Sequence, residues 1–540
     1  IQSQLPVEAL NSHDEFAKMY LPEIMKLWSA TNIYKFCIGF LCINCLWQIY
    51  LNIRQYRLMS RFPEPPAKLR RIVDPVYYQK ARHFRLDITR YEIVECILTH
   101  LVTIGFLHFG VALKLWKICP QLLARLGYKT KSELVLSAVF TSLAATISNL
   151  AGLPLDAYTT FFIDIKHGIC RPLGVKMYLL QRSIGFVKSQ VTTVAMSVMA
   201  VYLVKRFGPV AWVVYWAARC AFNILYEMLY MTVIAPYFQA VFRLPSGPLR
   251  RAAEDLANSI GFPLAELFVF GVSRFTSVSN AQIAGMFRKK YVILFDTLFV
   301  TEFVFQDDAH GLNKTSQRRG SQARDSETRT SQSRESNDSG QNSYFVAKRR
   351  FADDDILAII CHEMGHWKMS HIAKLFAFAE IERGMNNALV ALLYRNPIVF
   401  HAFGFNNNKE MPTVIGILLT TSILLMPFNN LATFIRTGYK RKCEIEADKF
   451  VHTMQYGPFM ERAVIRMNMD SLSFPLVDSL YTAWYKSHPP LPRRIEILRG
   501  DYSGLSGLST CHQSPGAATD NGAAENKGNL DRKSFDVKSK

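Results

Sequence analysis

Long apolar blocks alternate with basic or mixed segments along this 540-residue chain. A bilayer core about 30 Å thick requires roughly 20 apolar residues of helix to cross it. Runs of that length predict about seven membrane spans, near residues 33–53, 92–114, 134–153, 185–204, 210–234, 374–394 and 412–434. The pattern therefore predicts a polytopic, mostly α-helical membrane protein.

Between and after these spans the pattern changes. Residues 249–260 have an amphipathic helical pattern, and 267–270 and 292–295 predict strands, with a turn at Gly285 between them. Another helix is expected over 443–454. The predicted organisation is an N-terminal segment (1–32), spans one to five (33–234), a soluble α/β part (235–305), an insertion (306–350), a motif-bearing helix (351–372), spans six and seven (373–435), a C-terminal segment (436–500) and a tail (501–540). The insertion and the tail are too polar to offset the entropy of ordering, which predicts disorder.

The net charge of +20 is concentrated beside the spans. Ten lysines and arginines lie between residues 54 and 90 and four lie within 436–442, whereas 395–411 contains two. Since cytoplasmic loops are enriched in these residues, this predicts a non-cytosolic N-terminus and a cytosolic C-terminus, although the basic loop at 117–131 opposes that orientation. Contacts with membrane lipid account for the charge. The chain lacks a basic motif with interleaved aromatic residues, so the charge does not indicate nucleic-acid binding.

The ten cysteines show no paired spacing of the kind that metal sites or secreted disulfide frameworks use. Five of them lie in apolar spans, which predicts small buried hydrophobic residues rather than disulfides. These five are Cys37, Cys42, Cys45, Cys96 and Cys220.

One segment carries a recognisable chemical pattern, His362-Glu363-Met364-Gly365-His366. Histidines four apart lie on one face of a helix, so His362 and His366 can bind one tetrahedral Zn²⁺. Glu363 can then act as base on a water at the metal. The alternative is a surface helix with two hydrogen-bonded histidines. The apolar run 356–360 just before the motif argues against it, because a buried pair of histidines needs partners.

A catalytic zinc takes three protein ligands, so one more must come from elsewhere. Glu444 and Asp448 are four apart on a predicted helix, and either can ligate while the other orients a histidine from behind. Glu446 points to another face. His371 is a poorer ligand than His362 or His366, because it lies five residues past His366 and therefore on another face of the helix.

A third polar cluster combines His488-Pro489-Pro490 with Arg494. A histidine here can donate to the oxyanion of a tetrahedral intermediate, and the arginine can pair with a carboxylate. An ordinary loop before a helix explains the pattern equally well.

The order of these motifs, together with Ser279-Asn280-Ala281 and the run 292–298, resembles the type 1 CAAX prenyl protease family over roughly residues 30–500. The resemblance implies a seven-span helical barrel that encloses a chamber, with a zincin-like catalytic region containing a short sheet. The roles it implies are one Zn²⁺ on His362, His366 and Glu444, a general base at Glu363, a partner of a ligand at Asp448, transition-state contacts from His488 with Arg494 close by, and substrate alignment by an edge strand at Asn280.

The family removes the last three residues from farnesylated or geranylgeranylated CAAX proteins. The resemblance implies an endoplasmic reticulum location, with the nuclear envelope as a further site and the active site facing the cytosol. The chain departs from the family at 282–284, where Gln-Ile-Ala replaces an aromatic run, and in its 306–350 insertion. The charges Glu380, Glu382 and Arg383 in the sixth span should face the chamber or each other. Two rivals remain, a membrane quality-control zinc protease and a transporter or clearance factor.

Overall fold

The structure is a computed structural model that describes residues 29–169, 175–230, 240–273, 276, 278–285, 289–299, 351–407 and 411–501. The predictions of disorder for 306–350 and for the tail after Asp501 therefore lie outside the described residues.

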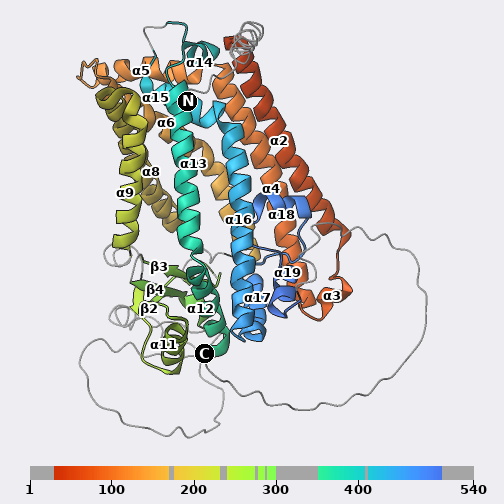
Figure 1. Cartoon of the computed structure of the whole chain (residues 1–540). Coiled ribbons are helices and arrows are strands. Elements are labelled where there is room, and N and C mark those ends of the chain that lie inside the picture. The colour runs from red at the N-terminus through yellow and green to blue at the C-terminus, as the bar shows by residue number, and fades with distance from the viewer. Residues whose placement is uncertain are drawn as a thin grey trace, which may run out of the picture. The chain divides into compact units, whose positions relative to one another are not determined.

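Long helices form a closed ring (Figure 1). They are α2 (Ala30–Arg61), α4 (Pro75–His108), α5 (Val111–Arg125), α6 (Glu133–Tyr158), α8 (Val175–Phe207), α9 (Ala211–Leu229), α13 (His371–Leu393) and α16 (Met426–Thr453). Each packs against the next in this order. Asn430 on α16 donates to the Asn44 carbonyl oxygen on α2 at 2.9 Å, which brings the last helix back to the first. This arrangement confirms the predicted helical barrel.

The predicted count of seven spans is not confirmed as such. Among the described residues, four helical segments are long and apolar enough to cross a membrane, namely Ala30–Arg61, Pro75–His108, Glu133–His167 and Tyr178–Leu229. A fifth arises if Thr413–Leu424 and Met426–Thr453, bent by 56°, form one span. The count differs because α8 and α9 follow each other through a single 3-10 turn at Gly208–Val210, and because α13 carries several charges.

Two of the three charges on α13 face each other, as predicted, while the third pairs with a neighbouring helix. Arg383 pairs with the buried Glu380, and Arg436 of α16 lies 2.7 Å from Glu382. Pairing of this kind removes much of the cost of placing charges at membrane depth.

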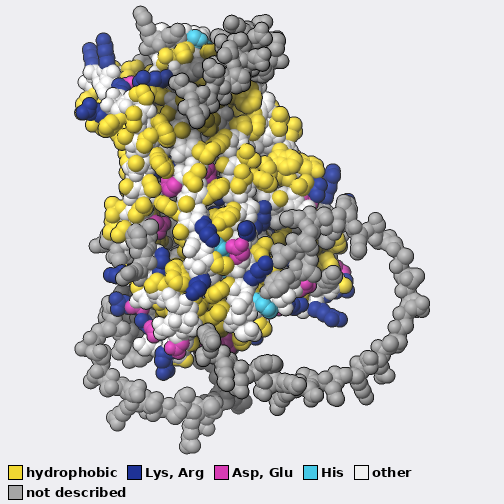
Figure 2. All heavy atoms as spheres, in the orientation of Figure 1, with side chains coloured by type: hydrophobic (Ala, Val, Ile, Leu, Met, Phe, Trp, Pro, Cys, Tyr) yellow, Lys and Arg dark blue, Asp and Glu magenta, His cyan; other side chains and the backbone are white. Residues whose placement is uncertain are grey.

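The outer faces of the helices are apolar. Ile43, Leu101 and Val191 are 64%, 59% and 65% exposed. Figure 2 shows hydrophobic side chains covering the middle of this face, while charged side chains gather towards its two ends. An exposed apolar belt of this size is the surface that lipid covers.

A four-stranded sheet lies beyond one end of the ring, in the order β1-β2-β4-β3 (Figure 1). Its strands are β1 (Val241–Arg243), β2 (Leu264–Phe270), β3 (Ala281–Ala284) and β4 (Lys290–Phe295). β2 and β4 are parallel and the other pairs are antiparallel, so β3 lies at an edge. The predicted strands are confirmed. The predicted turn at Gly285 is also borne out, since its φ is +92° and a Cβ there would meet the Lys289 carbonyl at 2.4 Å.

Short helices join the sheet to the ring. They are α11 (Pro248–Ile260), α12 (Asp353–Lys368), α17 (Gly457–Asp470), α18 (Ser479–Tyr485) and α19 (Leu491–Leu498). α11 confirms the predicted amphipathic helix, and its apolar face packs in one core with β2, β4, α12 and α17. α12 therefore lies between the sheet and the end of α16.

The end predicted for the seventh span is wrong. α16 runs without interruption from Met426 to Thr453, so the helix expected over 443–454 is its last part. The chain bends earlier, at Leu425, after a short π-helix at Thr420–Leu424. Gly438 alone costs about 1 kcal/mol in a helix interior, which does not end a helix packed on both sides. Glu444 and Asp448 are thus held on the same rigid rod as the membrane segment.

Candidate metal centre

The part of helix α12 that precedes its histidines is held in place by charge and by packing. Three aspartates, Asp353–Asp355, occupy its first turn, where negative charge is favourable to the helix dipole. Arg462 of α17 lies 2.8 Å from Asp355, and the apolar run 356–361 is buried. Gly365 then permits close contact with α16, because a Cβ there would lie 2.9 Å from the Phe450 ring.

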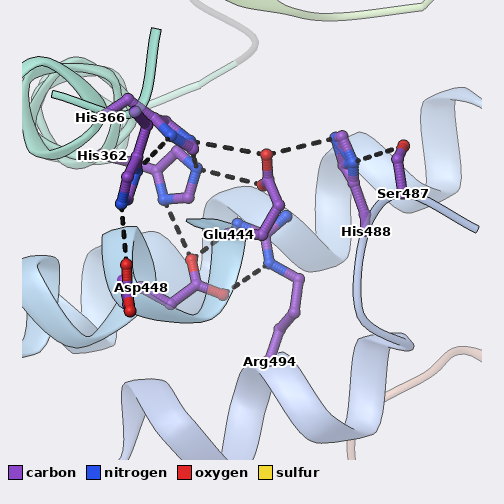
Figure 3. Close-up of polar contacts among 9 residues, drawn as sticks. His362, His366, Glu444, Asp448, Ser487, His488 and Arg494 are labelled. Atoms are coloured by element: carbon purple, nitrogen blue, oxygen red, sulfur yellow. Dashed lines mark hydrogen bonds and ion pairs between the residues drawn. The ribbon is translucent and has the colours of Figure 1, made fainter. Parts of the chain in front are cut away.

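Three donor side chains converge between α12 and α16. His362 Nε2 lies 3.3 Å from His366 Nε2. The two Glu444 oxygens lie 3.5 Å from these nitrogens, one from each (Figure 3). Tetrahedral bonds of about 2.0–2.2 Å place donor atoms about 3.3–3.5 Å apart. With one oxygen taken from Glu444, the donor set fits one tetrahedral metal ion and leaves a fourth position open.

Asp448 lies behind the first histidine. Its Oδ1 is 3.0 Å from His362 Nδ1, and Arg494 donates to both of its oxygens at 2.7 and 2.8 Å (Figure 3). Asp448 is fully buried and the Arg494 side chain is 11% exposed. The geometry separates the two acids that spacing left equivalent, because Glu444 reaches the Nε2 atoms and Asp448 reaches only Nδ1.

His371 and Glu446 belong to the same network, although the sequence interpretation set both aside. His371 Nδ1 lies 3.1 Å from His366 Nδ1, and His371 Nε2 lies 2.9 Å from Glu446 Oε2. His371 is on another face and is not one of the three donors, as expected. However, α12 ends at Lys368, and Ser370 with φ +56° turns the chain so that His371 returns behind His366. A positive φ at a serine leaves no signal in the sequence.

Glu446→Gln is expected to weaken metal binding by up to about tenfold, because Glu446 fixes the tautomer of His371, and His371 in turn contacts the ligating His366. Transfer of the metal to a competing chelator, followed in detergent-solubilised protein, measures the change. Glu496→Gln is the matched control, because that carboxylate pairs with Arg493 at the surface. Equal metal affinity in the two variants would contradict a role for His371 and Glu446.

Burial sets the protonation of the site. It raises the pKa of Glu363 to about 7 and lowers that of His366 to about 3. Burial opposes the charged form of His362 as well, but Asp448 and Glu444 outweigh it and raise that pKa to about 9. A neutral His366 has a free lone pair, and the acidic field at His362 attracts a cation. Glu363 can accept and release a proton near neutral pH.

A cavity of 630 Å³ opens beside the donors and is lined by Asn280, His488 and Arg494. His488 Nε2 lies 3.9 Å from Glu444 Oε1, with a side chain 58% exposed (Figure 3). Asn280 directly precedes β3, and its carbonyl accepts from Phe295 N at 3.0 Å. The structure thus brings together all the residues that the motifs and the resemblance selected.

Apolar helices in a ring, above a buried His-His-Glu donor set with an adjacent glutamate, define a membrane-embedded metallopeptidase. Residues 55–240 match the family model for the CAAX prenyl protease N-terminal region with five membrane helices, and 244–501 match peptidase family M48. The chain belongs to the type 1 CAAX prenyl protease family, and it is a multi-pass membrane metallopeptidase.

Individual relatives agree with this assignment. The chain is 30% identical over 458 residues to the CAAX prenyl protease 1 homolog of Homo sapiens, covering 84% of this chain and 92% of the relative. The Mus musculus homolog is 29% identical over 456 residues with the same coverage. The crystal structure of S. mikatae Ste24p matches with a TM-score of 0.71 and 24% identity, covering 86% of this chain and 99% of that one. That structural match supports the fold.

Proposed function

We propose that this protein is a zinc endopeptidase that removes the last three residues from prenylated CAAX proteins. The observation that carries the proposal is the tetrahedral spacing of His362, His366 and Glu444 beside the half-buried Glu363. These residues hold one zinc ion per chain, and the cavity next to them has room for a peptide. The printed names of the relatives support the choice of substrate.

Zinc bound here lowers the pKa of water towards about 7 and polarises the scissile carbonyl. Glu363 takes a proton from the attacking water and passes it to the leaving amine. Its raised pKa suits both steps, because the carboxyl can gain and lose a proton near neutral pH. His488 faces the cavity and donates its Nε2–H to the developing oxyanion. Asp448 holds His362 in the tautomer whose Nε2 is free to ligate. Arg494 acts through Asp448 as a positioning residue.

The free edge of β3 aligns the substrate. Among the described residues no strand pairs with the side of β3 that faces away from β4. An extended peptide can add there as a further strand, beginning at the exposed Asn280. Buried Ser279 anchors this edge, because its hydroxyl donates to Asp470 at 2.6 Å. In this chain the edge carries Gln282-Ile283-Ala284 in place of aromatic residues, and this difference affects which substrate side chains the edge prefers.

The substrates are farnesylated or geranylgeranylated C-termini, presented from the lipid in which the ring is embedded. We place the protein in the endoplasmic reticulum membrane and the nuclear envelope, with the catalytic end towards the cytosol. The basic residues at 54–90 and 436–442 support this orientation, since they flank the same end of the ring as α12.

Cleavage of a farnesylated CAAX peptide tests the function. Purified protein in detergent is expected to release the last three residues, to lose this activity with a zinc chelator and to regain it on adding Zn²⁺. The same peptide without the farnesyl group is the control and should be cleaved far more slowly. Equal cleavage of both peptides would favour a quality-control protease, and cleavage of neither would favour a transporter or clearance factor.

A further inference from the structure

A second group of metal-ligating side chains lies away from the catalytic centre, where α2 packs against α4. Cys45 Sγ is 3.9 Å from Cys96 Sγ. Cys96 Sγ is in turn 3.6 Å from His100 Nδ1 and 3.6 Å from Gln48 Oε1. Donor atoms of Cys45, Cys96 and His100 all lie within 4.8 Å of one another. Both thiols are free.

These distances have the values that one shared ion would impose. Zinc bonds of about 2.3 Å to sulfur and about 2.0–2.2 Å to nitrogen or oxygen, at tetrahedral angles, separate two sulfurs by about 3.8 Å. The same bonds separate sulfur from nitrogen or oxygen by about 3.6 Å. All three distances from Cys96 Sγ agree with these values to about 0.1 Å. The cluster therefore needs little rearrangement to close around a metal.

We propose that Cys45, Cys96 and His100 bind one thiophilic divalent ion, Zn²⁺, with the Gln48 amide oxygen in the fourth position. Two thiolates balance the charge of the ion, so the occupied site is neutral, which suits a half-buried place between apolar helices. Thiolate and imidazole together select zinc over magnesium or calcium.

Surrounding polar groups support the histidine. The Asn44 amide lies 3.3 Å from His100 Nε2 and also accepts a hydrogen bond from Asn430 of α16. Polar side chains at this depth are costly, and their presence around two thiols points to a function. The site therefore lies at the seam where the first helix of the ring meets the last, and a bound ion would link α2 to α4 there.

Binding requires no oxidation or reduction. Both thiols lose their protons as the two sulfur–metal bonds form, so two protons are released per ion. His100 Nδ1, which contacts the Cys96 carbonyl at 2.8 Å, gives up that hydrogen bond and becomes a ligand. Its ring proton moves to Nε2, and the Asn44 amide turns its oxygen to accept it, so the Asn430 amide must turn as well and accept from Asn44.

Cobalt reports this site separately from the catalytic one. Co²⁺ bound to thiolate shows charge-transfer absorption in the near ultraviolet, and the catalytic donors include no sulfur. Full-length, fully reduced His362→Ala protein in detergent, depleted of metal, is titrated with Co²⁺. We expect charge-transfer absorption that saturates at one ion per chain and disappears when Zn²⁺ displaces the cobalt.

Cys96→Ser and Cys45→Ser in the same background are each expected to lose the absorption, with at least a tenfold loss of cobalt affinity. Cys42→Ser is the matched control, since this exposed thiol lies on α2 outside the cluster and should change nothing. Peptide cleavage by Cys96→Ser and Cys45→Ser with intact catalytic residues shows that these variants fold. Absence of charge-transfer absorption in the reduced protein, or its persistence in Cys96→Ser, would overturn the site. The proposal would also be overturned if the two thiols were found only to form a Cys45–Cys96 disulfide and to bind no metal.

Discussion

Glu363→Gln is expected to lower kcat/KM for a farnesylated CAAX peptide by about 10²–10⁴-fold while the protein keeps its metal. The amide has the shape of the carboxylate but cannot accept the proton of the attacking water. Glu363 is not one of the three converging donors, so metal affinity does not depend on it. Its half-buried position and raised pKa are those of a group that exchanges protons, rather than of a ligand.

Kinetics and metal analysis on the same preparations test this assignment. Glu444→Ala is the matched comparison, because it removes a donor and should lower both metal content and activity. Loss of activity alone thus identifies Glu363 as the base, and loss of both metal and activity identifies Glu444 as a ligand. A Glu363→Gln enzyme that cleaves at the parent rate, or that loses its metal, would show that the base is elsewhere.

Arg494→Ala is expected to destabilise the protein by about 3–5 kcal/mol, because it leaves a buried carboxylate without its counter-ion. Asp448 is fully buried and accepts two hydrogen bonds from this guanidinium. The pair also joins α19 to α16 directly behind His362. We therefore expect metal affinity to fall together with the melting temperature.

Arg499→Ala provides the control. Arg499 lies on the same segment and pairs with Glu461, but its side chain is 55% exposed, and such surface pairs contribute about 0–1 kcal/mol. Thermal unfolding of the two variants in detergent, at equal metal concentration, gives the comparison. Adding Asp448→Asn to Arg494→Ala should recover part of the stability, since it removes the unpaired charge. If the two arginine variants melt alike, the Asp448–Arg494 pair does not hold the site together.

Local patterns were sufficient for much of the site. The spacing of His362 and His366 places them on one helical face wherever that helix lies, because it follows from 3.6 residues per turn. The 267–270 and 292–295 strands and the 249–260 helix are visible for the same reason, as period and burial agree over a short stretch. Pattern could not separate Glu444 from Asp448, because both occupy the same face of α16 and only the distance to α12 distinguishes them.

The bend in the chain and the pairing of membrane charges could not be predicted from the sequence pattern. The sequence predicted two separate elements, a span near 412–434 and a helix over 443–454. Instead the chain bends at Leu425, and α16 continues past residue 434 because it packs against neighbouring helices. The span count fell short of seven because the charges of α13 lower its apolar character. These charges pair with each other, with α16 and with Asn223 of α9.

By itself the sequence determined which side chains can do the chemistry and that the chain crosses a membrane, because ligand type, helical spacing and apolar length are properties of short segments. Only the tertiary structure decided which acid reaches the metal, that His371 and Glu446 lie behind His366, and that Cys45 meets Cys96 and His100. Apart from His366 and His371, which are five positions apart, these contacts join residues 51 to 82 positions apart on different helices. Helix packing and a single left-handed turn at Ser370 set such distances, and no local periodicity records them.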